Sequence, residues 1–384
     1  MATLDFKQLR KEYDNFLIPV AAVRINGKEL PNEKVKFQVA DYDIDLTSGF
    51  EASMASFSIY NTYDVNSGSF DTENVKKYIC LGSKVEIFLG YGEKAKLVFV
   101  GLIAKVSYQF YAEDIPCIRI TAMDAKSVMM AGNYSRQLKA STFTEAVKEI
   151  FERSAYVKLK SDGIINSVNI SSSGISSLSG NTGTGGNKAS TIEMVAESDY
   201  EFIVKLAKKN NYDFFIDAGN VIFRKAKENT TPLIAIHPSM GVQQFDIEYD
   251  ITGIAETIYT RSTDASKGEV IQANAKFSNK ISLGNKAKNL IKGSERVYID
   301  PTVTSKEEAQ SRVDSLMEDM AYRYGTLTMD IIGIPDLKPG YYIDILGMGD
   351  GPSNIFYITN VQHLARGEGK YITRVTGKSN ALPG

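Results

Sequence analysis

Hydrophobic and polar residues alternate along much of the chain, and a period of two residues predicts β-strands. Residues 35–39 alternate in one phase and residues 42–46 alternate in the opposite phase. Such a change of phase within one run is typical of a β-bulge, which allows a sheet to curve. Further apolar runs predict more strands: 55–60, 85–89, 97–110 and 115–122. Together they predict a small, strongly curved antiparallel β-barrel domain over residues 17–125, preceded by an N-terminal arm over residues 1–16 that contains a short helix.

The pattern changes to a helical period near the middle of the chain. Ser198 and Glu201 form a capping box, in which each side chain bonds to a backbone amide at the start of a helix. Apolar residues at helical spacing follow, and Asn210 and Asn211 can end the helix because asparagine tolerates the left-handed conformation. Two apolar runs around residues 217–220 then predict a hairpin, so the segment is expected to form a helix packed on a hairpin.

Two further features complete a predicted mixed α+β middle domain, residues 126–232. Thr142 and Glu145 form another capping box, which opens a second amphipathic helix. Residues 171–186 consist mostly of serine and glycine, and this composition buries too little apolar surface to order itself. We therefore expect an exposed loop between the two helical parts of the domain.

Strand patterns return after this domain and predict a second β-barrel domain over residues 233–384. The predicted strands are 245–251, 254–260, 269–275, 327–332, 341–346, 355–362 and 371–376, with irregular chain at 276–300. Ser305 and Glu308 form a third capping box for an amphipathic helix over 305–324, which we expect to pack on this barrel. The predicted fold class is α+β, mainly β, with two related small antiparallel β-barrel domains separated by a mixed helix–hairpin domain.

A short repeat links the two predicted barrels. Gly90-Tyr-Gly92 and Gly347-Met-Gly349 each follow a predicted strand, and the offset between them is 257 positions. Phe99 and Phe356 show the same offset on the strands that come next. Glycine supplies the backbone conformations that a tight turn requires. The repeat predicts the same strand–turn–strand corner in both barrels and favours an internal duplication over a chance match.

Segments from all three predicted domains resemble one protein family. The helix–hairpin segment ESDYEFIVKLAKKNNYDFFIDAGNVIFRK and the strand segments KLVFVGLIAKVSY, IRITAMDA and FYITNVQHLARGEGKYITRVTG are similar to phage late control protein D and to VgrG-like baseplate hub proteins of contractile injection systems. The resemblance covers about residues 17–380 and implies a homotrimer whose six barrels form a pseudo-sixfold ring. The chain ends at Gly384, directly after the second predicted barrel, and this indicates a hub without a fused needle, whose spike is a separate polypeptide.

Charge and composition exclude several other classes of protein. The chain has 44 basic and 46 acidic residues, so no basic excess is present to neutralise the phosphates of a nucleic acid. No apolar run is long enough for a membrane span, and no signal peptide is present, so the protein is expected in the bacterial cytoplasm during assembly. Cys80 and Cys117 lie in apolar strand patterns, which favours two buried free thiols over a disulfide.

Residue types that carry catalysis or bind cofactors are sparse. His237 and His363 lack the glycine-flanked serine of a hydrolase elbow, and with two cysteines they show no zinc spacing. The glycine-rich segment 180–188 has Gly186 where a phosphate-binding loop needs lysine, and no buried strand precedes it. We therefore predict no catalytic, cofactor-binding or metal-binding residues and no cofactor. Carboxylates are abundant, so a cell-wall hydrolase acting through Asp or Glu remains the alternative.

The resemblance implies a structural role rather than an enzymatic one. A baseplate hub of a contractile phage tail, a phage-tail-like bacteriocin or a related injection system joins a sixfold inner tube to a threefold spike. The expected partners are two further copies of the chain, the inner tube protein, a separate spike protein and other baseplate proteins. After assembly the protein would form part of the tail baseplate. A carbohydrate- or receptor-binding tail protein is a third hypothesis, because barrels rich in aromatic residues allow it.

Overall fold

The computed structural model describes residues 3–31, 37–171, 192–263, 268–277, 284–349, 351–367 and 369–380. The predicted fold class is confirmed in outline, because the chain is mostly β, with several antiparallel sheets and a smaller share of helix. The predicted serine- and glycine-rich loop at 171–186 lies outside the described residues from position 172 onward. The N-terminal arm contains helix α1 (Phe6–Glu12) and a 3₁₀ turn (Asp14–Phe16), where a short helix was predicted.

The first half of the main sheet consists of strands from residues 19–123. These strands are β1 (Pro19–Ile25), β2 (Lys28–Leu30), β3 (Gln38–Thr47), β4 (Met54–Tyr60), β7 (Lys84–Tyr91), β8 (Lys94–Gln109) and β9 (Cys117–Met123). Their hydrogen-bonded order is β3-β4-β9-β8-β7-β1-β2, and all the pairs are antiparallel. The predicted bulge is confirmed, because the register between β3 and β4 shifts between Ala40 and Asp43, and Asp41 has a φ of 56°.

The second half of the sheet is built from strands after residue 231. These strands are β15 (Pro232–Ile236), β16 (Val242–Tyr249), β20 (Gly325–Ile332), β21 (Tyr342–Ile345), β22 (Asn354–Arg366) and β23 (Lys370–Ser379). Their order is β16-β20-β23-β22-β21-β15. Without the short strand β2, which is added beside β1, each half has six strands, and numbered along the chain both halves have the order 2-3-6-5-4-1. The first five strands of that order pair antiparallel in both halves, whereas strand 1 is antiparallel in the first half and parallel in the second.

The repeated glycine motifs fall at equivalent corners of the two halves. Gly92 lies between β7 and β8, and Gly349 lies between β21 and β22; both have positive φ. Phe99 and Phe356 are buried on the strands that follow, and each lies opposite an isoleucine of the preceding strand. The internal duplication predicted from the motif thus agrees with the strand order.

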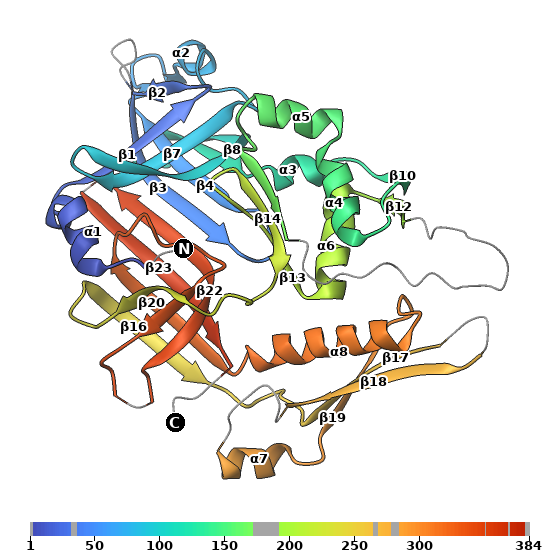
Figure 1. The fold of residues 1–384 in the computed structure, drawn as a ribbon. Helices are drawn as coiled ribbons and strands as arrows, with labels where there is room; N and C mark the ends of the chain where they lie inside the picture. The colour runs from blue at the N-terminus through green and yellow to red at the C-terminus, as the bar shows by residue number, and fades with distance from the viewer. Residues whose placement is uncertain are drawn as a thin grey trace.

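The two halves form one continuous sheet, because β22 pairs antiparallel with β3 (Figure 1). One hydrophobic cluster extends from α1 through both halves. Among the described strands, the hydrogen-bonded order ends at β16, at β15 and at β2, so closure of each half into a separate barrel stays a prediction. The first half lies above the second in Figure 1, with the middle of the chain packed to one side.

The middle of the chain forms a lobe with its own hydrophobic cluster. Its elements are α3 (Lys126–Met129), β10 (Tyr134–Leu138), α4 (Phe143–Phe151), α5 (Ser154–Ser161), β11 (Ser167–Ile170), β12 (Ile192–Glu197), α6 (Asp199–Asn210), β13 (Tyr212–Asp217) and β14 (Asn220–Lys225). The capping boxes predicted at Ser198 and Thr142 are both present, and Asn211 ends α6 in the left-handed conformation. The predicted hairpin is β13–β14, and α6 packs on β13.

Residues 250–324 form an insertion between β16 and β20, and here two predictions are wrong. Its elements are β17 (Thr257–Thr263), β18 (Val270–Lys276), α7 (Asn285–Ile291), β19 (Glu295–Ile299) and α8 (Lys306–Ala321). Helix α8 packs on β17 and β18, not on the second half of the main sheet, and these strands form a separate three-stranded sheet with β19. The chain expected to be irregular contains α7 and β19. Apolar helical spacing reveals which face is buried but not which sheet covers it.

The third predicted capping box is only half formed. The Ser305 hydroxyl accepts a hydrogen bond from the amide of Glu308, as expected. The carboxylate of Glu308 accepts instead from the amide and the hydroxyl of Thr304, at 2.8 and 3.0 Å. The amide and hydroxyl of Thr304, one residue before the N-cap, therefore bind the Glu308 carboxylate in place of the N-cap amide.

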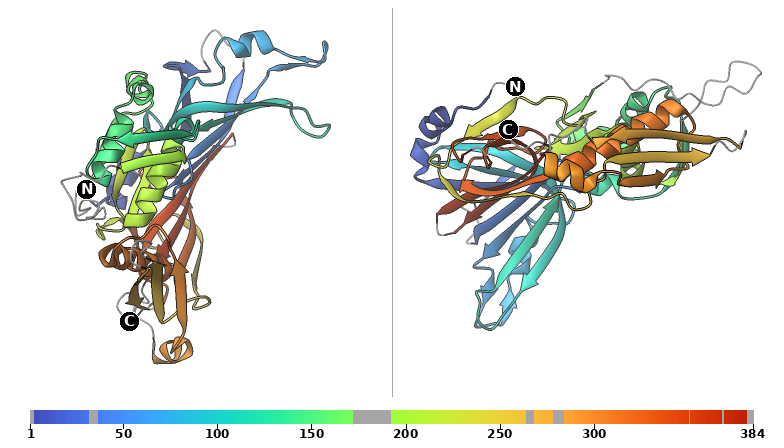
Figure 2. Two further views of the ribbon diagram at one scale, coloured as in Figure 1. Left: turned by 90° about the vertical axis from the view of Figure 1, so that its right-hand side faces the viewer. Right: turned by 90° about the horizontal axis from the view of Figure 1, so that it is seen from below.

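A second excursion of the chain, residues 61–83, lies between β4 and β7. It contains β5 (Tyr63–Asp64), β6 (Ser69–Phe70) and α2 (Thr72–Lys76). With the outer ends of β8 and β9 it projects from the body as an arm, seen in both panels of Figure 2. Aromatic rings stabilise the arm internally: Tyr63 lies 5.0 Å from Phe70 and 5.2 Å from Phe110, centroid to centroid.

Candidate functional site

The main sheet, the middle lobe and the insertion meet around one cleft of about 570 Å³, which we call the three-lobe cleft. Each of these three parts contributes residues to the wall of the cleft. Residues 47–51 at the end of β3 and after it, the first half of β22 and Lys378 of β23 come from the main sheet. The end of α6 and the start of β13 come from the middle lobe, and α8 comes from the insertion. Segments far apart in the sequence therefore converge on a single concave surface.

A cluster of tyrosines lies beside the cleft. The hydroxyls of Tyr322 and Tyr342 are 2.7 Å apart, and the ring of Tyr342 lies 5.2 Å from that of Tyr357. The Tyr357 hydroxyl donates to the buried carboxylate of Asp213 at 2.5 Å. Burial raises the pKa of both partners, although the Tyr357 hydrogen bond opposes the shift at Asp213. The cluster joins α8 of the insertion to β13 and β22.

A buried lysine positions one wall of the cleft. Lys126 is fully buried, and its Nζ donates to the carbonyl oxygens of Gly49, Phe50 and Glu51 at 3.0, 3.2 and 2.7 Å. Burial lowers the pKa of Lys126 to about 8, and Asp124 opposes this change. Because three carbonyls bind one ammonium, the connection from β3 to β4 is fixed where it borders the cleft.

Five cationic and three anionic side chains line the cleft. Lys227 forms an ion pair with Asp319 at 3.3 Å and lies 4.8 Å above the ring of Tyr322. Lys208 lies over an aromatic ring, and Arg312 pairs with Asp300 outside the cleft. The remaining cations are Arg323 and Lys378. The cleft therefore carries an excess of positive charge at its walls.

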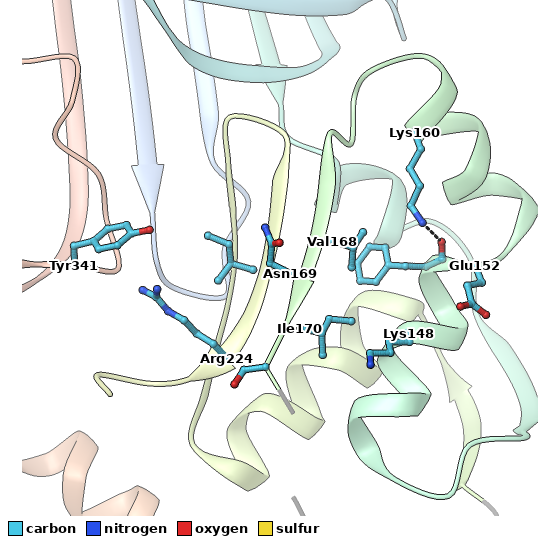
Figure 3. Close-up of a pocket in the computed structure, with 11 residues that line it drawn as sticks. Lys148, Glu152, Lys160, Val168, Asn169, Ile170, Arg224 and Tyr341 are labelled. Carbon is cyan, nitrogen blue, oxygen red and sulfur yellow. Dashed lines mark hydrogen bonds between the residues drawn. The ribbon is translucent and has the colours of Figure 1, made fainter. Parts of the chain in front are cut away.

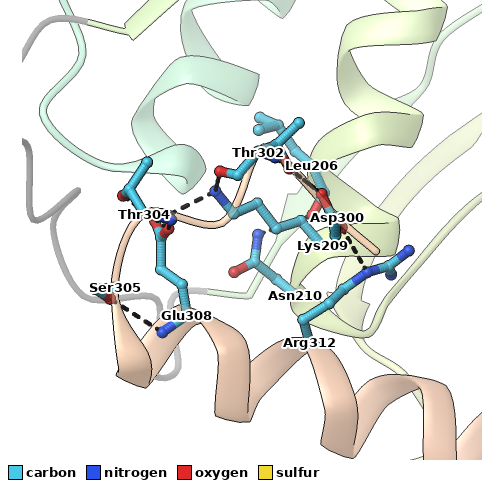
Figure 4. A network of polar contacts seen from close by, with 9 residues as sticks. All are labelled: Leu206, Lys209, Asn210, Asp300, Thr302, Thr304, Ser305, Glu308 and Arg312. Carbon is cyan, nitrogen blue, oxygen red and sulfur yellow. Dashed lines mark hydrogen bonds and ion pairs between the residues drawn. The ribbon is translucent and has the colours of Figure 1, made fainter. Parts of the chain in front are cut away.

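A polar network next to the cleft ties α6 to the insertion (Figure 4). Lys209 forms an ion pair with Glu308 at 3.2 Å and donates to the carbonyl of Thr302 at 3.4 Å. Arg312 pairs with Asp300 at 3.1 Å and donates to the carbonyl of Lys208. Asn211 donates to Glu318 at 2.5 Å. These bonds fix the orientation of the insertion against the middle lobe.

A second cavity, of about 800 Å³, lies between helices α4 and α5 and strands β11 and β14 (Figure 3). Two of its three cations, Lys160 and Arg224, have structural partners. Lys160 donates to the carbonyl of Phe151 at 2.9 Å. Arg224 donates to the carbonyl of Gly340 and lies 5.0 Å from the ring centroid of Tyr341. These contacts join the middle lobe to the main sheet and leave little in this cavity that points to a ligand.

The arm carries the most marked exposed apolar surface of the first half. Its exposed side chains include Val65, Tyr108, Phe110, Tyr111 and Ile115. Exposed apolar side chains that gather on one projection are typical of a surface that binds another protein. The arm is therefore a second candidate surface for assembly.

The residues singled out from the sequence do not come together in a site. His363 is fully buried on β22, with Nδ1 3.0 Å from the Tyr371 hydroxyl, as expected for a packing residue. His237 is exposed at the end of β15 and contacts Ser239. Both cysteines are free, but the prediction that both are buried is wrong, because Cys80 is exposed and only Cys117 is buried.

The described part of the chain contains neither a metal-binding cluster nor a helix that could span a membrane. No group of three or more His, Cys, Asp or Glu side chains there could hold a metal ion. Helices of the described segments are too short or too polar to cross a membrane.

Sequence patterns did not predict the three-lobe cleft. Lys227, Arg323 and Lys378 lie in separate elements and carry no motif. The one available signal was Lys126, a cation within an apolar stretch after a predicted strand. Its burial depends on carbonyl groups that only the folded chain brings together.

Comparison with solved structures places the fold among tail proteins. A tail protein from Neisseria meningitidis MC58 is 13% identical, with a TM-score of 0.67 over 95% of this chain and 97% of its own. The 43 kDa tail protein of prophage MuSo2 from Shewanella oneidensis is 13% identical, with a TM-score of 0.63 over 94% of this chain and 98% of its own.

A third structure extends the similarity to secretion systems. The E. coli c3393 protein, described as a component of the type VI secretion system similar to T4 tail proteins gp27 and gp5, is 10% identical, with a TM-score of 0.54 over 94% of this chain and 76% of its own. The expected resemblance is thus confirmed at the level of the fold. Comparison with curated proteins gave no match. The family model described as the Alg8 N-terminal domain matches residues 126–366, more than half of the chain.

Proposed function

This chain belongs to the Alg8 N-terminal domain family, and we propose that it is the structural hub of the baseplate of a contractile tail or related injection particle. The proposal is supported by a fold shared with tail proteins and with a type VI secretion component. In this role three copies of the chain join a sixfold inner tube to a threefold spike. The spike, the tube and other baseplate proteins are the proposed partners.

One observation carries the proposal: the same strand order occurs twice in one continuous sheet. A threefold assembly of identical chains offers three equivalent surfaces, whereas a sixfold tube requires six. A chain with two similar halves supplies six similar surfaces from three copies. The two halves differ in their excursions, so the same trimer also offers features that occur three times, as a threefold spike requires.

The arm adds a surface for contacts within the particle. The side chains of Phe110 and Tyr111 are 59% and 61% exposed, although both are large and aromatic. Exposed aromatic side chains of this kind are common in interfaces, since they bury much area at low entropic cost. We propose that the arm packs on a neighbouring subunit or another baseplate protein.

Imaging of the assembled particle tests the hub role. We expect three copies of the chain around the tail axis, with first and second halves alternating in a ring below the inner tube. A neutral fusion tag at the C-terminus would appear as three densities and would count the copies independently. Six copies, or halves that lie at different distances from the axis, would rule out the adaptor role.

No observation favours the hydrolase alternative. The buried carboxylates of the described chain have structural partners: Asp124 accepts from the amides of Ser53 and Lys126, Asp199 pairs with Arg153, Asp213 accepts from Tyr357, and Asp330 pairs with Arg374. We expect purified protein to release no more fragments from peptidoglycan than a buffer control. Release that one Asp or Glu substitution abolishes would contradict the structural role.

A further inference from the structure

Unbalanced positive charge in the three-lobe cleft is the feature that the hub role leaves unexplained. Lys227 has Asp319 as its partner, and Arg312 has Asp300. Among the residues that the structure describes, no carboxylate lies within ion-pair distance of Lys378 or Arg323. Lys378 is only partly exposed, so water does not fully compensate its charge.

Neighbouring cations increase the cost of this arrangement. The pKa of Lys378 is lowered, first by burial and then by the positive charges of Arg323 and Lys227, which outweigh Asp319 and Glu51. A cation held beside two others in a partly buried place destabilises the unliganded protein. An anion that entered the cleft would relieve this repulsion and gain charge-assisted hydrogen bonds.

The shape and lining of the cleft indicate what kind of anion fits. Its volume of about 570 Å³ is large enough for several side chains of a peptide, and it opens where three parts of the molecule meet. Phe50 and Leu316, both half-buried, supply apolar surface, while Asn211 and Asn360 supply amide groups. Mixed apolar and amide walls beside cations suit a peptide that carries carboxylates better than a small, fully hydrated ion.

The geometry points to a binding site in the three-lobe cleft for an acidic peptide segment of a partner protein, with its carboxylates on Lys378 and Arg323. Lys227 supports the site with a third positive charge while it stays paired with Asp319. Because Lys378 belongs to the main sheet and Arg323 follows α8, the bound segment would bridge the sheet and the insertion. The assignment does not depend on the hub role.

Binding of a labelled oligoglutamate peptide, followed by fluorescence anisotropy with the full chain, tests this site. The parent protein should bind it saturably and more weakly at high salt, whereas oligoglutamine of the same length should not bind. The double variant Lys378→Gln, Arg323→Gln removes two charge-assisted bonds, so its affinity should fall about tenfold or more. Lys378→Arg should retain most of the affinity because it keeps the charge.

Matched controls separate the site from general electrostatic attraction. Lys94→Gln removes an exposed lysine at the corner between β7 and β8 and should leave binding unchanged. The double variant should melt no lower than the parent, because the substitutions relieve repulsion. Equal loss of binding in Lys94→Gln, unchanged binding in the double variant, or no binding by the parent would each overturn the proposal. Saturable binding of inorganic phosphate without binding of oligoglutamate would overturn the peptide assignment.

Discussion

In the first half of the sheet the long excursion of the chain follows β4, whereas in the second half it follows β16. These are not equivalent positions, since β4 corresponds to β20 and β16 corresponds to β3 in the shared strand order. The first excursion forms the arm, and the second forms an insertion with its own hydrophobic cluster. Strands in the centre of a packed sheet constrain one another on both sides, while connections at strand ends tolerate added chain.

The last strand of the shared six-strand order also differs between the two halves, because the chain enters this strand from different directions. β1 follows the N-terminal arm and runs antiparallel to β7, whereas β15 follows the middle lobe and runs parallel to β21. Among the described strands β1 pairs with β7 on one side and β2 on the other, whereas β15 pairs with β21, and parallel and antiparallel pairing both satisfy the backbone hydrogen bonds. The two halves therefore share the order and directions of five strands, and the segment that precedes the sixth strand places that strand.

The largest effect is expected from the equivalent core phenylalanines. Phe99→Ala and Phe356→Ala each remove a fully buried ring, so each should lower the free energy of unfolding by about 3–5 kcal/mol. Because one hydrophobic cluster spans both halves, each variant should unfold the whole sheet in a single transition, measured by denaturant titration with circular dichroism. Separate transitions for the two halves would show that the pairing of β22 with β3 does not couple them.

The next effect concerns pH and the strand pair that joins the halves. His363 lies opposite Ile44 of β3, and burial lowers its pKa from 6.5 to about 3. Above pH 6.5 the histidine is neutral in both the folded and the unfolded chain. Between pH 6.5 and 3 the unfolded chain binds the proton and the folded chain does not, so stability falls as pH falls. A pKa difference half as large would already lower the free energy of unfolding by about 2 kcal/mol.

A non-titrating variant isolates this histidine from the carboxylates that also titrate. His363→Gln should show a flatter loss of stability between pH 6.5 and 3 than the parent, measured as unfolding free energy at each pH. His237→Gln serves as the matched control, because it makes the same chemical change at an exposed histidine. Parallel profiles for the parent and His363→Gln would mean that His363 is protonated in the folded protein.

A smaller effect is expected at the equivalent glycine corners. A methyl group on Gly90 would lie 1.9 Å from the carbonyl oxygen of Lys94, so Gly90→Ala should cost about 2 kcal/mol. Gly349→Ala meets no atom within 4 Å and has only its positive φ of +87° to overcome, about 1 kcal/mol. Thermal melting of the two variants would rank them, and a greater loss in Gly349→Ala would contradict the assigned corner geometry.

The smallest change in stability is expected on the arm. Tyr111→Ser replaces an exposed side chain, so the free energy of unfolding should fall by no more than about 0.5 kcal/mol, whereas Phe110→Ser also loses the ring contact with Tyr63, worth about 0.5–1.5 kcal/mol. Incorporation into particles, measured by immunoblot of purified particles, should nevertheless fall because the apolar contact surface is lost. Lys77→Ser, an exposed polar position near α2, should affect neither quantity. Normal incorporation of both aromatic variants would argue against the arm as an interface.

Much of the fold was predicted from the sequence because it depends on local chemistry. The phase change near Asp41, the capping boxes at Thr142 and Ser198, the helix end at Asn211 and the β13–β14 hairpin depend on neighbouring residues only, and each was predicted. The glycine repeat predicted equivalent corners because tight turns impose a local backbone requirement.

The rest of the fold and the candidate site depend on contacts between segments that are distant in the sequence. The pairing of β22 with β3, the packing of α8 on β17 and β18, and the three carbonyls around Lys126 join residues far apart in the chain. An amphipathic pattern specifies that a face is buried but not which partner covers it, so helix 305–324 was assigned to the wrong sheet. The positive cleft has the same origin, since Arg323 lies just before β20 and comes near Lys378 through the pairing of β20 with β23.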